Sequence, residues 1–283
     1  MSHGRFFALC ALLVAFGFSS TSAAPTRGAT HGGNSELSSG LARWMTRLVQ
    51  DAMQSAVLQG DATLPDHWFG PGPLHKVWVR ADEHAVLSEI EASGALLRTL
   101  DYGAFAVAVV DEVRVEGGRE ALESSGYRFR DELDLMVLNG FLLNGQRPQD
   151  VFSRLDPAER FGDERGGGLD PQAGLYIVQF AGPVRDEWIQ ELDTFQVGFR
   201  QYLPMNAYVI DLPADQVYAF ETYALASPDV QFVSAYEPAF KLHPVLRRAL
   251  AMQVTDSMHV TVQLVGGDGT RAALAELGTL LTD

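Results

Sequence analysis

Histidines, carboxylates and glycine-rich turns are the groups in this chain whose spacing would support catalysis or metal binding. Seven histidines are spread along the chain, and no two stand at the spacing of a metal-ligand pair: His3, His31, His67, His75, His84, His243 and His259. The sequence has neither the Gly-x-Ser-x-Gly turn of α/β-hydrolases nor the His-Glu-x-x-His helix of zinc peptidases. We therefore expect surface or loop histidines and no metal site.

A glycine-rich turn at 266–269 follows an apolar run and opens a predicted helix, where free backbone amides can hold an anion. It lacks the Lys-Ser/Thr of a P-loop and the spacing of the dinucleotide-binding fingerprint, so a simple turn explains it. Neighbouring acids, such as Asp131 with Glu132 and Glu187 with Glu191, are expected as solvated faces and helix N-terminal charges. The residues thus predict no cofactor and no catalytic group.

The N-terminus has the parts of a secretory signal. Arg5 gives a positive start, residues 6–18 form an apolar stretch too short to cross a bilayer, and small residues precede a cleavage point after Ala23. The one cysteine, Cys10, lies within this stretch, so the mature chain would have no disulfide and no thiol. We expect residues 1–23 to be a signal peptide rather than a buried helix. The protein would then be secreted, either extracellular or periplasmic, with no membrane span in the mature chain.

Composition limits the kinds of partner. The formal net charge of −15 would repel a nucleic acid, but it suits a basic or neutral protein partner. An apolar fraction of 47% and a charged fraction of 20% are ordinary for a globular protein. About 260 residues remain after the signal, which is room for two domains of usual size.

The elements that must position these groups come as a recurring unit of strand, amphipathic helix and second strand. We expect the first copy at 77–80, 83–93 and 96–110, and the second at 175–180, 185–195 and 198–212. In the second copy Trp188, Leu192 and Phe195 line one helix face. A third copy opens at 259–265, continues through 270–281 and has no returning strand. Because a βαβ unit cannot bury its faces alone, we expect that repeat to be truncated.

The second copy continues with a helix at 214–224 and a strand at 230–233. Strand, helix, strand, helix and strand make most of the ferredoxin-like βαββαβ pattern. The fourth strand would come either from 239–242 or from the segment just before the unit. The expected fold class is α+β, with tandem ferredoxin-like βαβ units and antiparallel sheets, preceded by a signal peptide and an N-terminal helix.

The expected organisation places other features between these units. Residues 24–75 would be a flexible lead-in and an amphipathic helix, which packs on the first unit or, alternatively, binds a partner. Residues 76–145 would hold the first βαβ unit and a β-hairpin, since Asn139-Gly140 separates two apolar runs. The remaining expected segments are a protease-accessible linker at 146–173, a propeptide-like ferredoxin-like domain at 174–243, and the truncated repeat at 244–283.

Three blocks of sequence carry a family resemblance: 176–188, 202–209 and 230–242. Their most specific parts are Gly182-Pro183 with Glu187-Trp188, and the run Tyr236-x-Pro238-Ala239-Phe240-Lys241. The blocks resemble the propeptide-like region of large secreted bacterial subtilisin-like serine proteases, the subtilases. Residues 130–134 are similar to the segment that often precedes that region, and the strand that begins at His259 resembles a further repeat.

The resemblance implies an accessory role. In that family a ferredoxin-like prosegment lays a sheet face on the catalytic domain and runs a C-terminal tail into the cleft. It assists folding and inhibits the enzyme until it is cut. The residues that this implies for protein binding are Tyr236, Pro238, Phe240, Lys241 and Leu242, and the partner is a subtilisin-like catalytic domain in cis or in trans.

The chain itself lacks the Asp, His-Gly and Gly-Thr-Ser-Met-Ala blocks that form the triad of such a protease. Serine endopeptidase activity would therefore belong to a catalytic domain outside the sequence. Three other interpretations stay open: a stand-alone secreted module that binds peptides or inhibits a protease, a structural domain of a surface or matrix protein, and α+β domains with another role.

Overall fold

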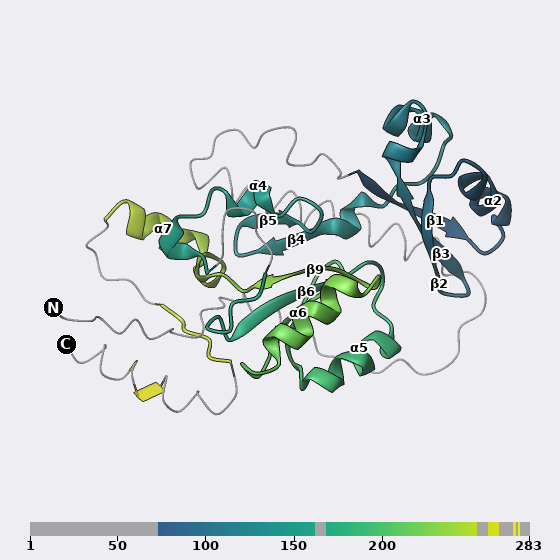
Figure 1. The fold of residues 1–283 in the computed structure, drawn as a ribbon. Helices are drawn as coiled ribbons and strands as arrows, with labels where there is room; N and C mark the ends of the chain where they lie inside the picture. The colour runs from purple at the N-terminus through teal and green to yellow at the C-terminus, as the bar shows by residue number, and fades with distance from the viewer. Residues whose placement is uncertain (1–72, 162–167, 254–259, 266–273, 276, 278–283) are drawn as a thin grey trace, which may run out of the picture. The chain divides into compact units, whose positions relative to one another are not determined.

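The computed structural model describes residues 73–161, 168–253, 260–265, 274–275 and 277 (Figure 1). The predicted signal peptide and the helix expected in the lead-in lie outside the described residues, as do His259 and the glycine turn at 266–269. The chain divides into two compact units. One contains Pro65–Met136 and Leu143–Pro238, and the other contains Met1–Leu64, Val137–Leu142 and Ala239–Asp283.

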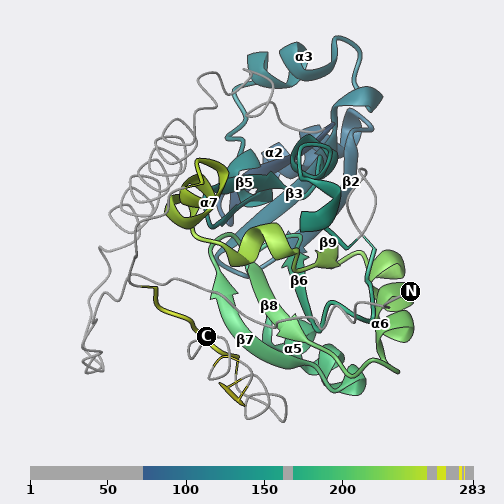
Figure 2. The same ribbon diagram turned by 90° about the vertical axis from the view of Figure 1, so that its left-hand side faces the viewer.

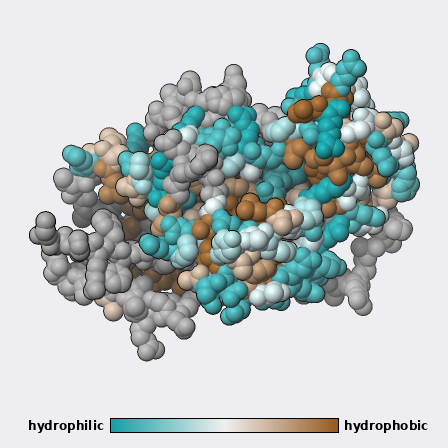
Figure 3. Space-filling model, viewed as in Figure 1, coloured by the Kyte–Doolittle hydropathy of each residue, from teal (hydrophilic) through white to brown (hydrophobic). Residues whose placement is uncertain are grey.

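The fold is mixed α+β, and the strands of its sheets pair antiparallel. A search of the described residues for a helix long and apolar enough to cross a membrane found none. In the face shown in Figure 3, apolar patches are interrupted by hydrophilic surface.

The first sheet contains β1 (Leu74–Arg80), β2 (Leu96–Asp101) and β3 (Phe105–Asp111) in the order β1-β3-β2. The prediction of a single returning strand at 96–110 was wrong, because the chain reverses after β2. Gly103 adopts a φ of +77°, and its N–H donates to the Asp101 carboxylate at 2.8 Å, which makes the turn.

Helix α2 (His84–Ala92) connects β1 to β2 and packs on one face of this sheet. Val77 and Val79 of β1 lie on that face together with Ile90 of α2, and all three are buried. Lys76 and Trp78 alternate with them along the strand and lie on the opposite face. Trp78 packs against the core of the second sheet, so β1 is covered on both sides.

The segment after β3 returns to β1. It contains η2 (Glu112–Arg114), α3 (Gly118–Ser124) and η3 (Asp131–Asp134). The N–H of Trp78 donates to the carbonyl of Arg128 at 3.0 Å, and the N–H of Arg130 donates to the carbonyl of Lys76 at 2.7 Å. These hydrogen bonds fix the start of η3 beside β1.

The predicted hairpin is confirmed. Strands β4 (Leu135–Leu138) and β5 (Phe141–Asn144) pair with each other. Asn139 and Gly140 between them have φ values of 42° and 87°, as the turn in a two-residue hairpin requires.

The segment expected to be a linker is partly structured. Helix α4 (Gln149–Phe152) and the short helix η4 (Pro157–Glu159) follow β5. Val151, Phe152 and Leu155 are buried there. These apolar side chains pack in a core, which is why residues 146–161 are not an open connection.

The second sheet has four strands in the order β7-β8-β6-β9, which lie side by side in Figure 2. In chain order the elements are β6 (Leu175–Phe180), α5 (Asp186–Leu192), η5 (Asp193–Phe195), β7 (Gly198–Leu203), β8 (Ala207–Asp211), α6 (Val217–Ala226) and β9 (Val230–Ala235).

The expected second strand of this unit, 198–212, is in fact two strands. Met205 and Asn206 have φ values of 71° and 62°, and the turn that they make separates β7 from β8. Because residues 198–212 form two strands instead of one, the sheet has four strands. The proposed source at 239–242 was wrong, because Pro238–Lys241 forms a short 3-10 helix, η6.

Both helices of this unit pack on one face of the sheet. Tyr176 and Phe180 of β6 lie in one core with Trp188 of α5 and Phe220 of α6. The other face of β6 is buried as well, since Gln179 is 0% exposed. A Cβ added at Gly145 would collide with that glutamine, so the backbone after β5 covers the sheet there.

The structure describes only part of the predicted third repeat: residues 260–265 of its expected strand, and residues 274–275 and 277 of its expected helix. Residues 260–265 are irregular rather than a strand, and Leu274, Ala275 and Leu277 are helical. Between η6 and this segment lies α7 (Pro244–Ala251), which belongs to the second compact unit and has no buried residue.

Candidate functional site: a buried polar network on β1

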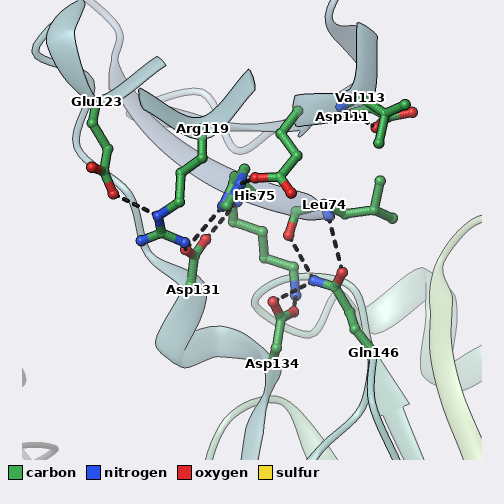
Figure 4. Close-up of polar contacts among 11 residues, drawn as sticks. Leu74, His75, Asp111, Val113, Arg119, Glu123, Asp131, Asp134 and Gln146 are labelled. Carbon is green, nitrogen blue, oxygen red and sulfur yellow. Dashed lines mark hydrogen bonds and ion pairs between the residues drawn. The ribbon is translucent and has the colours of Figure 1, made fainter. Parts of the chain in front are cut away.

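Two neighbouring polar residues of β1 are the centre of a buried network. His75 and Lys76 are 0% and 2% exposed and, as successive residues of a strand, point to opposite faces. Figure 4 shows this part of β1 with Asp131 and Asp134 of η3 and with Gln146, which follows β5. Buried charged groups are rare unless they are paired, so each needs a partner.

His75 lies between two carboxylates. Its Nδ1 is 3.0 Å from Oδ2 of Asp131, and its Nε2 is 2.9 Å from Oε2 of Glu112. Both ring nitrogens are donors only in the imidazolium form. Burial opposes that form, but the hydrogen bonds and charges of the two carboxylates outweigh burial and raise the pKa of His75.

Asp131 joins this histidine to its surroundings. Its Oδ1 accepts a hydrogen bond from the Lys76 backbone N–H at 3.3 Å. The guanidinium of Arg119 is 3.9 Å from Oδ2 of Asp131 and also pairs with Glu123. Strand β1 is therefore tied to η3 and α3 through one carboxylate.

Lys76 makes the second buried contact. Its Nζ is 2.5 Å from Oδ1 of Asp134, which is 0% exposed, and it also donates to Oε1 of Gln231 in β9. Burial is the main cause that lowers the pKa of Lys76 and raises the pKa of Asp134, against the attraction between them. Burial thus shifts the pKa of each group in the direction of its neutral form.

Glutamines complete the network. Gln146 donates to Oδ2 of Asp134 at 2.5 Å and to the Leu74 carbonyl at 2.8 Å, and its own oxygen accepts from the Leu74 N–H at 3.2 Å. Gln231 donates to Gln179 at 3.0 Å, and Gln179 donates to the carbonyls of Leu133 and Met205, each at 3.1 Å. Gln179 is buried and the other two glutamines are half-buried, and their hydrogen bonds hold β1, η3, β6 and β9 in one arrangement.

Burial limits the reactions in which the network can take part. The side chains of His75, Lys76 and Asp134 are buried, so no outside substrate reaches them. Within the network, Lys76 and Asp134 bring an amine and a carboxyl group into contact.

A second group of residues lines an open pocket of about 470 Å³. The guanidinium of Arg185 lies 4.4 Å from the ring centre of Tyr102 and 5.3 Å from that of Trp188. Glu191 accepts a hydrogen bond from the hydroxyl of Tyr223 at 2.7 Å. The pocket is lined by Asp101, Tyr102, Val184, Arg185, Asp186, Glu187, Trp188 and Glu191, and a shallow site of this kind fits a polar surface contact.

The structure places the residues predicted for protein binding mostly in the interior. Tyr236 and Phe240 are 2% and 0% exposed, and Lys241 is 7% exposed. Pro238 and Leu242 are half-buried. Pro238–Lys241 is helical, so these residues do not form an extended tail.

The expectation of surface histidines was wrong for His75 and right for His84, which is exposed. His243 precedes α7 and accepts a hydrogen bond from the N–H of Val245 at 3.3 Å. Asp131, expected on a solvated face, instead binds His75. No group of three or more His, Cys, Asp and Glu side chains suited to a metal ion was found among the described residues.

Sequence reasoning missed Lys76, Asp134 and Gln146. One signal was present: His75-Lys76 interrupts a strand that is otherwise apolar. Two adjacent polar residues in such a strand predict buried partners, although they do not say which residues these are.

Comparison with known proteins gives one match. A domain of unknown function (DUF8729) matches residues 146–237, the range that contains α4 and the four-stranded sheet. No curated protein and no solved structure matches the chain. Residues 146–237 are thus similar to a domain of unknown function.

Proposed function

We propose that the chain is the non-catalytic, prosegment-like part of an exported subtilisin-like serine protease, which assists folding of the catalytic domain or inhibits it. The observation that carries this proposal is the fold of residues 175–235. The sequence of elements β6-α5-β7-β8-α6-β9 and the strand order β7-β8-β6-β9 support a ferredoxin-like βαββαβ arrangement. This is the fold that the sequence resemblance implies for a prosegment.

The resemblance and the fold support each other by position. The three similar blocks lie on β6 with α5, on the β7–β8 turn, and on β9 with η6. The export part of the proposal depends on the predicted signal at residues 1–23 alone.

The edge strand β7 is the part of the sheet best suited to contact the enzyme. Gln179 of the central strand is buried on the face away from the helices, so that face is not open for docking there. Strand β7 pairs with β8 on one side, and no strand pairs with its other side among the residues that the structure describes. Tyr202 on this edge is 54% exposed. An extended segment of a protease can add to such an edge through main-chain hydrogen bonds.

Residues 236–242, the tail of the prosegment-like domain, would bind the protease cleft after the first contact at β7. Because Tyr236 and Phe240 are buried, residues 236–242 reach a protease cleft only when η6 unwinds. Initial binding would therefore be at β7, and the tail would follow.

The same edge favours a second candidate function. A stand-alone secreted module that binds peptides or inhibits a protease in trans needs only an exposed strand edge, and not a catalytic domain in the same chain. In that case the chain would inhibit a mature protease but would not help one to fold.

The experiment uses the chain recovered from the medium of a secreting host. It is added to a bacterial subtilisin-like protease, and hydrolysis of a small peptide substrate is followed. In parallel, the yield of active protease is measured after the protease refolds from denaturant. Inhibition together with a raised yield supports the prosegment function, and inhibition alone supports the stand-alone inhibitor. If the chain neither inhibits the protease nor raises the yield of refolded enzyme, both proposals are overturned.

A matched pair of variants tests the edge. Tyr202→Glu puts a charge on β7, and we expect it to weaken inhibition by about tenfold, roughly 1.4 kcal/mol. Tyr218→Glu makes the same change on α6, where the tyrosine is 79% exposed, and should leave inhibition unchanged. Equal effects of the two variants would argue against binding at β7.

A further inference from the structure

The buried pair Lys76 and Asp134 has the geometry of reactants. Nζ of Lys76 and Oδ1 of Asp134 are 2.5 Å apart, and the two side chains are 2% and 0% exposed. Contact at this range, held by a rigid surrounding, is what makes a reaction within one molecule fast compared with the same reaction between free groups.

The two oxygens of the Asp134 carboxyl group have different neighbours, since Oδ1 lies against Nζ of Lys76. Oδ1 of Asp134 has no hydrogen-bond partner, although it is buried, whereas Oδ2 accepts from Gln146 at 2.5 Å. A buried polar atom without a hydrogen bond needs an explanation. The two carboxyl oxygens of Asp134 therefore differ. Oδ2 is held by the amide of Gln146, and Oδ1 contacts the amine of Lys76.

We propose that Lys76 and Asp134 become joined by an isopeptide bond within the folded chain. The lone pair of the neutral Nζ attacks Cγ of the protonated Asp134 carboxyl group, and the C–N bond forms. One proton of Nζ passes to the Oδ1 hydroxyl, the Cγ–Oδ1 bond breaks, and water leaves. Oδ2 remains as the carbonyl oxygen of the new amide, so the reaction needs no oxidant, reductant or other reactant.

The surroundings favour the reacting forms. A lysine is nucleophilic only as the free amine, which burial promotes by lowering its pKa. Burial also raises the pKa of Asp134, and so promotes the neutral carboxyl group that an amine can attack. Exclusion of water from the site removes the hydration that would stabilise the separate ions.

The neighbouring glutamines are placed for both the reaction and its product. Charge develops on Oδ2 as the nitrogen adds, and the amide of Gln146 already donates to that oxygen. Gln231 accepts a hydrogen bond from Nζ and would accept the one N–H that the product amide keeps. The product thus has a partner for its donor and for its acceptor, and the buried Oδ1 no longer exists.

The test is the mass of the purified full chain under denaturing conditions. We expect it to be lighter than the chain's sequence requires by one water molecule. After digestion, the peptides that contain Lys76 and Asp134 should be found as one branched species. Trypsin should fail to cut after Lys76, because the modified side chain no longer fits its specificity.

The chain contains two lysines, which provides a matched control. Lys76→Arg should restore the full mass, whereas Lys241→Arg should still lack one water molecule. Separate, unlinked peptides for Lys76 and Asp134 from the folded wild-type chain would overturn the proposal, whether or not the variants fold. Loss of ammonia in place of water would also overturn it, since that would point to a glutamine as the reacting partner.

Discussion

Nδ1 of His75 lies 3.0 Å from Oδ2 of Asp131, although the two residues belong to β1 and η3. Glu112 binds the other ring nitrogen at 2.9 Å. A histidine held on both nitrogens by carboxylates acts as a charged connection between β1, η2 and η3. The contact is buried at the histidine, so it should contribute more than an exposed ion pair.

This relationship predicts a stability that depends on pH. The folded-state pKa of His75 is raised above its ordinary value of 6.5. The stabilisation is therefore fully present below pH 6.5 and is lost as the pH rises through the raised value. We expect the melting temperature to fall by several degrees between about pH 6 and about pH 9, with a smaller fall in His75→Asn.

The exposed histidine supplies the control for this prediction. His84→Asn removes an exposed imidazole from α2 without touching the network, and it should keep the wild-type pH dependence. A wild-type melting temperature that rises with pH over this range would contradict the role given to His75.

Removal of one member of the buried pair should be costly. Lys76→Met leaves the buried carboxyl group of Asp134 without its amine partner, and we expect a loss of about 1–3 kcal/mol in the free energy of unfolding. Lys76→Met combined with Asp134→Leu should recover much of this loss, because no polar group is then buried without its partner. Urea denaturation of the single and double variants measures the difference, and a double variant no more stable than the single one would refute it.

The turn after β5 is expected to tolerate no side chain. A Cβ at Gly145 would collide with the Gln179 side chain and lie 3.2 Å from Cβ of Phe232. Gly145→Ala should therefore cost about 1–3 kcal/mol of stability, by displacing a glutamine that holds two backbone carbonyls. Denaturation in urea tests this, and an unchanged midpoint would show that the sheet is not covered there.

The core under α5 and α6 gives a further prediction. Trp188 is 4% exposed and stacks on Phe180, with ring centres 5.5 Å apart. Trp188→Ala should lower the free energy of unfolding by about 3–5 kcal/mol. Tyr218→Ala, at a side chain 79% exposed on α6, is the control and should change stability little. Comparable losses from both would mean that Trp188 does not lie in the core.

Periodicity and turn residues predicted much of the local structure. Asn139-Gly140 predicted the hairpin because few other residue pairs adopt positive φ twice in succession. The prediction of two long return strands was wrong because the chain reverses at Gly103 and at Asn206, and the turn residues there were not used as strand ends.

The polar network was beyond prediction from sequence. Lys76 and Gln231 meet because β1 and β9 pack close together, and their distance along the chain carries no signal of that contact. Burial of His75 is equally a result of packing on both faces of β1. The local pattern showed two polar residues, His75 and Lys76, in the first strand. Their partners follow only from the packing of the two sheets.

The most direct test of the proposed function is hydrogen exchange of the chain with and without an active-site-blocked subtilisin-like protease. We expect the backbone amides of β7 to become protected on binding, since an added strand would pair with its free edge. Tyr202→Glu should reduce that protection, and Tyr218→Glu should not. Exchange at β7 that is unchanged by saturating protease would contradict the account.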